Sequence, residues 1–187
     1  DEKNKDSLFL NDYWSRYKKL FFESRDDESI LKLRDLIKET NSIGGKIIFI
    51  GNGASASLSS HAATDFTKQA KIKAIAFNDH NLITALSNDY GYENWVSKAI
   101  EYYAEKSDLI IFISVSGESV NLVNGLNYAL NNNLKTASIT GSKKNNTLMS
   151  KSEISLWVNS KAYNIVESIH TIWVTLIIDL LVGHPEY

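Results

Sequence analysis

The chain has 187 residues, of which 43% are hydrophobic and 22% are charged, enough for one sizeable core but not for two. Twenty Lys and Arg against 22 Asp and Glu give a net charge of -2, so we expect no nucleic-acid and no membrane partner. The lack of cysteine excludes disulfides, thiolate zinc sites and a Cys nucleophile. The longest wholly apolar runs, such as Leu109 to Ile113, are far shorter than the roughly 20 residues of a membrane span. We therefore expect one cytoplasmic domain covering residues 1–187.

Residues 1–44 are predicted to form two leading helices. Apolar side chains recur at helical spacing over residues 6–24 and again over residues 30–37, up to the stop at Gly44 and Gly45. Phe9 and Phe22 lie off the main apolar stripe of the first helix, which is therefore apolar around more of its circumference than packing on one neighbour requires. This predicts a subunit interface, and hence a homo-oligomer.

From residue 45 onward, short β-branched and aromatic runs alternate with helical patterns. The runs predict strands at residues 46–50, 72–77, 109–115, 136–140 and 154–158. Helical spacing covers residues 54–69, 92–104, 119–131 and 163–182. Because the strand-like runs are apolar on both faces, they indicate parallel strands buried beneath helices. The predicted fold class is α/β, with a doubly wound parallel sheet flanked by helices.

Two turns that follow predicted strands, residues 51–57 and 114–119, are candidates for ligand binding, because ligands of open parallel sheets bind beyond the carboxyl ends of the strands. The second turn combines three serines with a helix N-terminus, whose free N–H groups and positive dipole end suit a phosphate. Helix capping is the competing explanation for a single serine, but three in six residues favour binding. The first turn lacks the Gly-Lys-Ser/Thr of a Walker loop and the full dinucleotide spacing, which disfavours ATP and NAD.

Arginine is confined to the leading helices, at Arg16, Arg25 and Arg34. Hydroxyls and backbone amides must therefore make most contacts with any phosphate held by the α/β core. This pattern favours a small phosphorylated metabolite.

Two pairs of titratable side chains stand one helical turn apart. His61 and Asp65 share a face of the helix after the first turn, and Glu167 and His170 share a face of the last helix. Either pair could bind a metal or act as acid and base. The alternative is that these are ordinary surface or capping residues, although the apolar pattern of the last helix argues against full solvation of Glu167 and His170.

The motifs together resemble those of a known family. They are Gly51-Asn52-Gly53-Ala54-Ser55, His61-Ala62-Ala63-Thr64-Asp65, Ser87-Asn88-Asp89-Tyr90-Gly91, Ile113-Ser114-Val115-Ser116-Gly117-Glu118-Ser119, Thr140-Gly141 and Glu167-Ser168-Ile169-His170. Over nearly the whole chain, this set resembles the sugar isomerase (SIS) domain, in its phosphoheptose isomerase branch. The resemblance implies a five-stranded parallel sheet and a homotetramer with active sites between subunits. It also implies conversion of sedoheptulose 7-phosphate to D-glycero-D-manno-heptose 7-phosphate, for lipopolysaccharide or capsule heptose, often with zinc.

The resemblance further implies roles for individual residues. The substrate-binding residues would be Asn52 and Asp89 on the sugar and Ser55, Ser114, Ser116 and Ser119 on the phosphate. A divalent metal would be bound by His61, Asp65 and Glu167, and Asp65 or Glu167 would be the catalytic base. The family's second catalytic His falls on Thr175, which cannot act as a base near neutral pH. His170 is the candidate for the missing imidazole role, on condition that the last helix is rotated or the substrate sits differently.

Two functions from different classes therefore remain open. The first is a phosphosugar isomerase, favoured by the retained His61, Asp65 and Glu167. The second is a catalytically silent SIS protein that binds a phosphosugar or a protein partner, favoured by Thr175.

Overall fold

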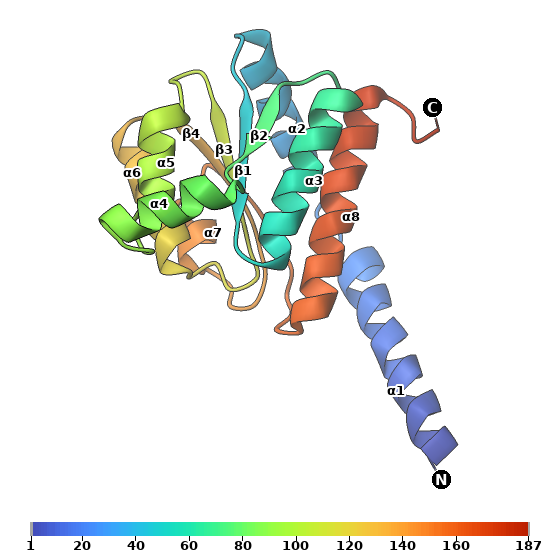
Figure 1. The fold of residues 1–187 in the computed structure, drawn as a ribbon. Helices are drawn as coiled ribbons and strands as arrows, with labels where there is room; N and C mark the ends of the chain where they lie inside the picture. Colours follow the sequence, from blue (N-terminus) through green and yellow to red (C-terminus); the bar gives the residue numbers. More distant parts are fainter. Residues whose placement is uncertain (1, 187) are drawn as a thin grey trace.

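The computed structural model describes residues 2–186 and shows a five-stranded, all-parallel sheet with strand order β2-β1-β3-β4-β5. The strands are β1 (Ile47–Gly51), β2 (Ala74–Ala76), β3 (Leu109–Ser114), β4 (Lys135–Thr140) and β5 (Ile154–Trp157). Every residue of β1 and β3 is buried, because helices cover both faces of the sheet (Figure 1). The predicted fold class is confirmed.

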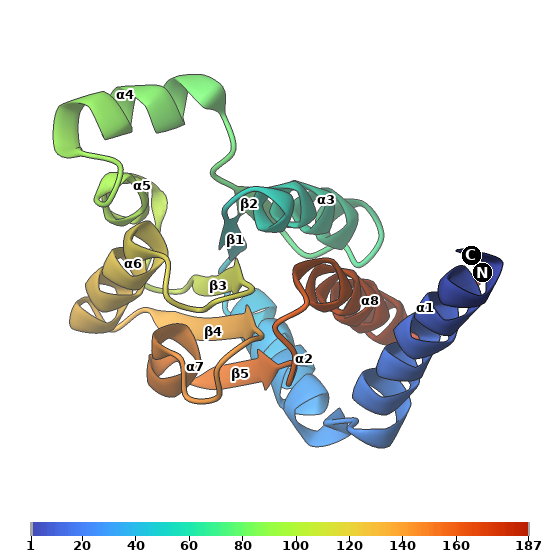
Figure 2. The same cartoon turned by 90° about the horizontal axis from the view of Figure 1, so that it is seen from below.

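Helices cover both faces of the sheet, apart from α1, which projects away from the body (Figures 1 and 2). They are α1 (Glu2–Tyr17), α2 (Asp27–Ser42), α3 (Ala54–Lys68), α4 (His80–Tyr90), α5 (Trp95–Tyr103), α6 (Val120–Asn131), α7 (Thr147–Lys151) and α8 (Tyr163–Val182), with a π-helical segment at Lys18–Glu23. Helices α2, α3 and α8 bury one apolar cluster against the sheet. Helices α5, α6 and α7 bury a second cluster on the opposite face, against which α4 also packs.

The structure adds two helices that the apolar pattern did not predict, α4 and α7. No residue of α4 is fully buried. Its apolar side chains that pack on the neighbouring core, Leu82, Ile83 and Leu86, span little more than one turn, which is too short a stripe for periodicity to identify. Its N-terminal cap is Asp79, whose carboxylate accepts a hydrogen bond from the Leu82 N–H at 3.0 Å. Asn146 caps α7 in the same way through the Met149 N–H, at 2.9 Å. These Asx caps were the available sequence signal for both helices.

Helix α1 projects from the body of the molecule and has no buried residue (Figure 1). Phe9 and Trp14 are each 64% exposed, and Phe22, in the π-helical segment, is 66% exposed. A row of exposed aromatic side chains on a projecting helix is uncommon unless another surface covers it.

Helix α8 is long and apolar enough, by length and composition alone, to cross a membrane. Its buried side chains, among them Ile169, Trp173 and Ile177, belong to the apolar cluster shared with α2 and α3. A core helix of an α/β domain passes the same test of length and composition, so this feature is weak evidence for a membrane span.

The buried carboxylate of Asp108 connects the starts of β1 and β3. The side chain is 1% exposed and accepts hydrogen bonds from the Lys46 N–H at 2.9 Å and the Glu105 N–H at 2.8 Å. The Lys46 ammonium supplies a charged partner. Two backbone donors and one cation satisfy this buried charge, so it stabilises the entry into the two central strands.

We expect Asp108→Ala to lower the free energy of unfolding by about 2 to 4 kcal/mol, since two backbone N–H groups lose their acceptor and Lys46 loses its counter-ion. Urea denaturation at fixed protein concentration measures the change. Asp35→Ala, which removes an exposed ion pair with Arg34, is the control and should cost less than about 1 kcal/mol. Equal losses in the two variants would contradict the structural role of Asp108.

Candidate functional site

The turns after β1 and β3 meet at the carboxyl edge of the sheet. The two strands are adjacent and parallel, with Gly51 opposite Ile113, so the segments that follow them emerge side by side. Between them lies a cavity of about 110 Å³, which we call the serine pocket. It is lined by Asn52, Ser55, Ile113, Ser114, Val115, Ser116, Ser119, Tyr163 and Glu167. The structure thus brings five of the six predicted substrate-binding residues together.

The turn of residues 114–119, which we call the serine turn, presents hydrogen-bond donors to this pocket. Ser119 occupies the N-cap position of α6, but its hydroxyl makes no capping hydrogen bond, so the competing explanation of a simple cap does not apply to it. The first N–H groups of α6 have no partner within the helix. Ser114 and Ser116 already accept hydrogen bonds from the Gly117 and Glu118 N–H groups, at 3.0 and 3.2 Å. Their hydroxyl oxygens lie 3.5 Å apart, a long contact that a bound anion can replace by accepting from both hydroxyls.

The serine turn is anchored to the segment that leads into α7. Gly117 has φ of +67°, and a Cβ at this position would lie 1.9 Å from the Asn146 Oδ1 atom. The Gly117 carbonyl accepts from the Leu148 N–H at 3.1 Å, and the Glu118 carboxylate accepts from the Thr147 N–H at 2.9 Å. These contacts hold the turn in one conformation before a ligand binds, which lowers the entropic cost of binding.

A second cavity, of about 370 Å³, lies between α3 and α8, and we call it the helix cavity. Its walls are Ala54, Ser55, Leu58, Asn164, Glu167, Ser168, His170 and Thr171. Ser55 and Glu167 line both cavities, so the two are neighbours. Among residues 2–186, no Lys or Arg lines either cavity. A phosphate bound in either cavity of this chain would therefore be contacted by hydroxyls and amides, as the sequence predicts.

His170 is buried in the wall of the helix cavity. Its Nε2 atom lies 2.8 Å from the Thr140 carbonyl oxygen, and its Nδ1 atom has no hydrogen-bond partner within the described part of the chain. Burial lowers the pKa of the imidazole to about 4, although the hydrogen bond to the Thr140 carbonyl raises it. The ring is therefore neutral at pH 7, with Nε2–H donating to Thr140 and Nδ1 available as an acceptor.

His61 and Asp65 do contact each other, as their spacing predicts, with 3.3 Å between Nε2 and Oδ2. The His61 side chain is 56% exposed, that of Asp65 is 17% exposed, and neither lines the serine pocket or the helix cavity. Within residues 2–186 of a single chain, no three His, Cys, Asp or Glu side chains form a metal-binding group. The predicted set of His61, Asp65 and Glu167 is therefore not assembled as a three-ligand site within one chain.

Asp89 and Thr175 lie outside both cavities. Asp89 is exposed near the end of α4, where its carboxylate accepts from the Asn88 amide at 3.1 Å, so one chain does not bring it to the serine pocket. Thr175 is half-buried on α8, and its hydroxyl donates to the Thr171 carbonyl at 3.0 Å. This bond within the helix occupies the hydroxyl at the position of the family's second His.

Sequence reasoning missed several cavity residues, among them Tyr163, Asn164 and Thr171 at the start of α8. Only the first helical turns of α8 line the cavities. The usable signal was the polar character of this end of an otherwise apolar helix.

The parallel sheet with two neighbouring polar cavities at its carboxyl edge defines a class, the α/β proteins of the SIS family. Residues 12–141 match the SIS domain, and the chain belongs to this family. Its curated relatives include the phosphoheptose isomerase of Thermodesulfovibrio yellowstonii, 35% identical over 83% of this chain and 79% of the relative. The phosphoheptose isomerase of a Helicobacter pylori strain is 33% identical over 78% of this chain and 79% of the relative.

Comparison of structures gives the same fold. The phosphoheptose isomerase of Neisseria gonorrhoeae superimposes with a TM-score of 0.86, covering 97% of this chain and 98% of the other, at 21% identity. The similarity includes the leading helices, since almost the whole of both chains is covered.

We expect the double variant Ser116→Ala and Ser119→Ala to weaken the binding of inorganic phosphate and of phosphosugars by at least tenfold. Each hydrogen bond to a charged group contributes about 1.5 to 3 kcal/mol. Isothermal titration calorimetry measures the affinities. The control is Ser150→Ala, at an exposed position of α7, which should bind as the unaltered protein does. Unchanged affinity in the double variant would place the phosphate elsewhere.

Proposed function

We propose that this protein is a phosphosugar isomerase that converts sedoheptulose 7-phosphate to D-glycero-D-manno-heptose 7-phosphate, in heptose synthesis for lipopolysaccharide or capsule. The observation that carries the proposal is that the two cavities are neighbours and share Ser55 and Glu167 in their walls. One cavity has the donors for a phosphate, and the other has room for a polyol chain and a carboxylate in its wall. Relatives named phosphoheptose isomerase, at 31 to 38% identity, support the same reaction.

The reaction moves a proton between C1 and C2 through an enediol, so it requires a base near both carbons and donors near the developing oxyanion. Glu167 is half-buried on α8 and, within residues 2–186, is the only carboxylate that lines the two cavities. We assign it the role of base. Asp65 remains a second candidate, because the family's active sites lie between subunits and a neighbouring chain can bring further groups to α3.

His170 serves in this proposal as a neutral ring that orients the substrate. With Nε2–H held by Thr140 and the pKa lowered to about 4, it is a weak base at pH 7. Its Nδ1 atom is buried and has no partner within residues 2–186, so it can accept a hydrogen bond from a substrate hydroxyl when the side chains that cover it move aside.

Zinc is assigned no step of the proposed reaction. Within residues 2–186 of a single chain, His61, Asp65 and Glu167 do not form a three-ligand group, so one chain alone does not supply the donor set that the metal needs. His61 and Asp65 form a pair that a divalent cation bound between subunits could use, and a metal titration of the assembled oligomer addresses that directly.

The rival function is a catalytically silent SIS protein that binds a phosphosugar or a protein partner. The observation in its favour is Thr175, whose hydroxyl is bonded to its own helix and cannot supply the lost imidazole. The two functions differ in what they require of Glu167 and Asp65, since a binding protein needs no base.

We expect Glu167→Gln to lower kcat for sedoheptulose 7-phosphate by about 100-fold or more, with little change in phosphate affinity, because the amide cannot accept the substrate proton. Asp65→Asn is tested in parallel, and a comparable loss would assign the base to α3 instead. Glu39→Gln, which alters an exposed partner of Lys135, is the control for removing one carboxylate. A coupled assay of ketose and aldose phosphates gives the rates. Full activity in both site variants would contradict the assignment of a carboxylate base.

We also infer that the chain is a single cytoplasmic SIS domain, with residues 1–44 as leading helices and residues 45–187 as the α/β core, and that it assembles into a homotetramer. Support comes from the exposed aromatic side chains of α1 and from an apolar cavity of about 350 Å³ between the segment after α1 and α8. Phe21, Phe22, Ile172 and Trp173 are among its walls. Apolar surface of this extent is stabilised when a second copy covers it.

We expect light scattering to give a mass of four times 21.0 kDa for the unaltered protein. Trp14→Glu should shift the mass toward smaller species, because a buried charge in an apolar interface is unfavourable. Lys18→Glu, a charge change at an exposed position in the next segment, is the control. A single 21.0 kDa species for the unaltered protein would refute the tetramer.

A further inference from the structure

Asn52 is held by a reciprocal pair of amide hydrogen bonds with Asn121 at the start of α6. The Asn52 Nδ2 atom donates to the Asn121 Oδ1 atom at 3.0 Å, and the Asn121 Nδ2 atom donates to the Asn52 Oδ1 atom at 2.9 Å. Asn121 is 2% exposed and lines neither the serine pocket nor the helix cavity. Asn121 can therefore act on a ligand in these cavities only through Asn52.

A third side chain completes the arrangement. The Tyr92 hydroxyl donates to the Asn52 Oδ1 atom at 3.3 Å, so this oxygen has two donors for its two lone pairs. One proton of the Asn52 Nδ2 atom is used by Asn121, which leaves the other to donate elsewhere. Since Asn52 lines the serine pocket, it presents a single N–H donor there.

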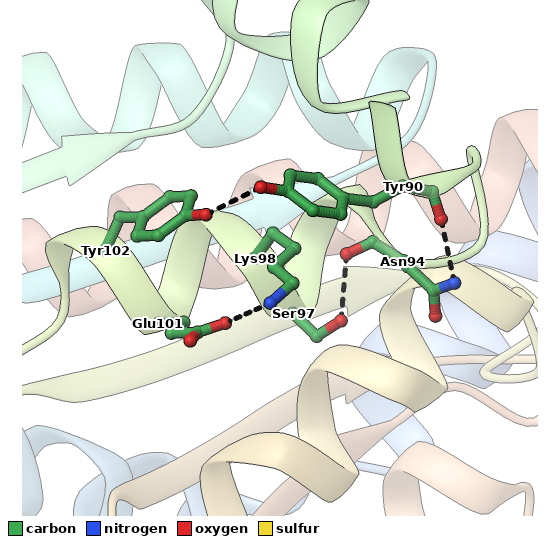
Figure 3. A network of polar contacts seen from close by, with 6 residues as sticks. All are labelled: Tyr90, Asn94, Ser97, Lys98, Glu101 and Tyr102. Atoms are coloured by element: carbon green, nitrogen blue, oxygen red, sulfur yellow. Dashed lines mark hydrogen bonds and ion pairs between the residues drawn. The ribbon is translucent and has the colours of Figure 1, made fainter. Parts of the chain in front are cut away.

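Helix α6 also positions the loop that carries Tyr92. Asn124, one turn after Asn121, donates to the Glu93 carbonyl at 2.9 Å. The flanks of this loop are joined by the contacts shown in Figure 3, in which the Tyr90 and Tyr102 hydroxyls lie 2.9 Å apart and the Asn94 amide donates to the Tyr90 carbonyl at 2.9 Å. The Lys98 ammonium lies 4.9 Å from the centre of the Tyr90 ring, a cation–π contact.

We propose that Asn121 is a positioning residue, which together with Tyr92 fixes Asn52 as an N–H donor to an oxygen of the bound phosphosugar. The inference rests on the proposed function for the identity of the ligand. The carbonyl and hydroxyl oxygens of a sugar accept hydrogen bonds, so a fixed N–H donor at Asn52 is complementary to them. Without Asn121 only the 3.3 Å hydrogen bond from Tyr92 holds the Asn52 amide, and its donor is aimed at the ligand for less of the time.

A double-mutant cycle tests whether Asn121 acts through Asn52. Asn52→Ala and Asn121→Ala should each weaken the binding of sedoheptulose 7-phosphate about tenfold in calorimetry, and the double variant should bind no more weakly than Asn52→Ala alone. Asn127→Ala, on the same helix, removes an acceptor of Lys151 and is the matched control, with unchanged affinity. Losses that multiply in the double variant, or full affinity in Asn121→Ala, would overturn the proposal.

A second measurement does not depend on the ligand. Hydrogen exchange of the Asn52 side-chain amide, followed by ¹⁵N–¹H NMR of the free protein, should be slow in the unaltered protein and in Asn127→Ala, and fast in Asn121→Ala. Fast exchange in all three would refute the amide pair whatever the protein binds. The two proposals can also fail separately. If exchange is slow in the unaltered protein and fast in Asn121→Ala, the amide pair is supported. If the unaltered protein then neither binds nor converts sedoheptulose 7-phosphate, the proposed function is refuted.

Discussion

Parallel pairing of β1 with β3 is the constraint on which the site depends. The two strands are neighbours in the sheet, yet the chain winds from β1 to β2 on one side and from β3 to β4 on the other. The turns after them therefore open away from each other, and a crevice forms where they separate. Asn52 and the serine turn lie at this crevice, and α8 returns from the far edge of the sheet to close it with Glu167.

A phosphate site without lysine or arginine has to rely on geometry. Hydroxyls and helix N–H groups contribute much less individually than a guanidinium fork, so they must be aimed correctly before the ligand arrives. Asn146, which packs against Gly117 of the serine turn, makes the turn rigid. It is fully buried, and its amide donates to Thr140, Gly141 and Lys143. The neighbouring Thr140 carbonyl also holds His170, so one strand end supports both cavities.

The two faces of the sheet are stabilised differently. On the face of α2, α3 and α8, long helices bury a continuous apolar cluster. On the other face, α4 has no fully buried residue and packs on the second cluster only through partly buried apolar side chains. Its Asp79 cap and the polar contacts around Tyr90 add to this support. Polar contacts on an exposed helix are individually weak, so this helix and the loop that carries Tyr92 are the part of the site with the least packing to support them.

The sequence by itself determined the layout of the core and the phosphate turn. Short β-branched runs with no polar face are typical of strands buried on both sides, and three serines at a helix start are a local pattern, so both follow from neighbouring residues. Tertiary structure alone decided which side chains from distant segments meet. It joined Asn52 to Asn121, brought Glu167 to Ser55, and left His61 and Asp65 as a separate pair. It also buried His170 and lowered its pKa. Burial and contacts between distant segments depend on how α8 packs on the sheet, and the spacing of neighbouring residues cannot predict that packing.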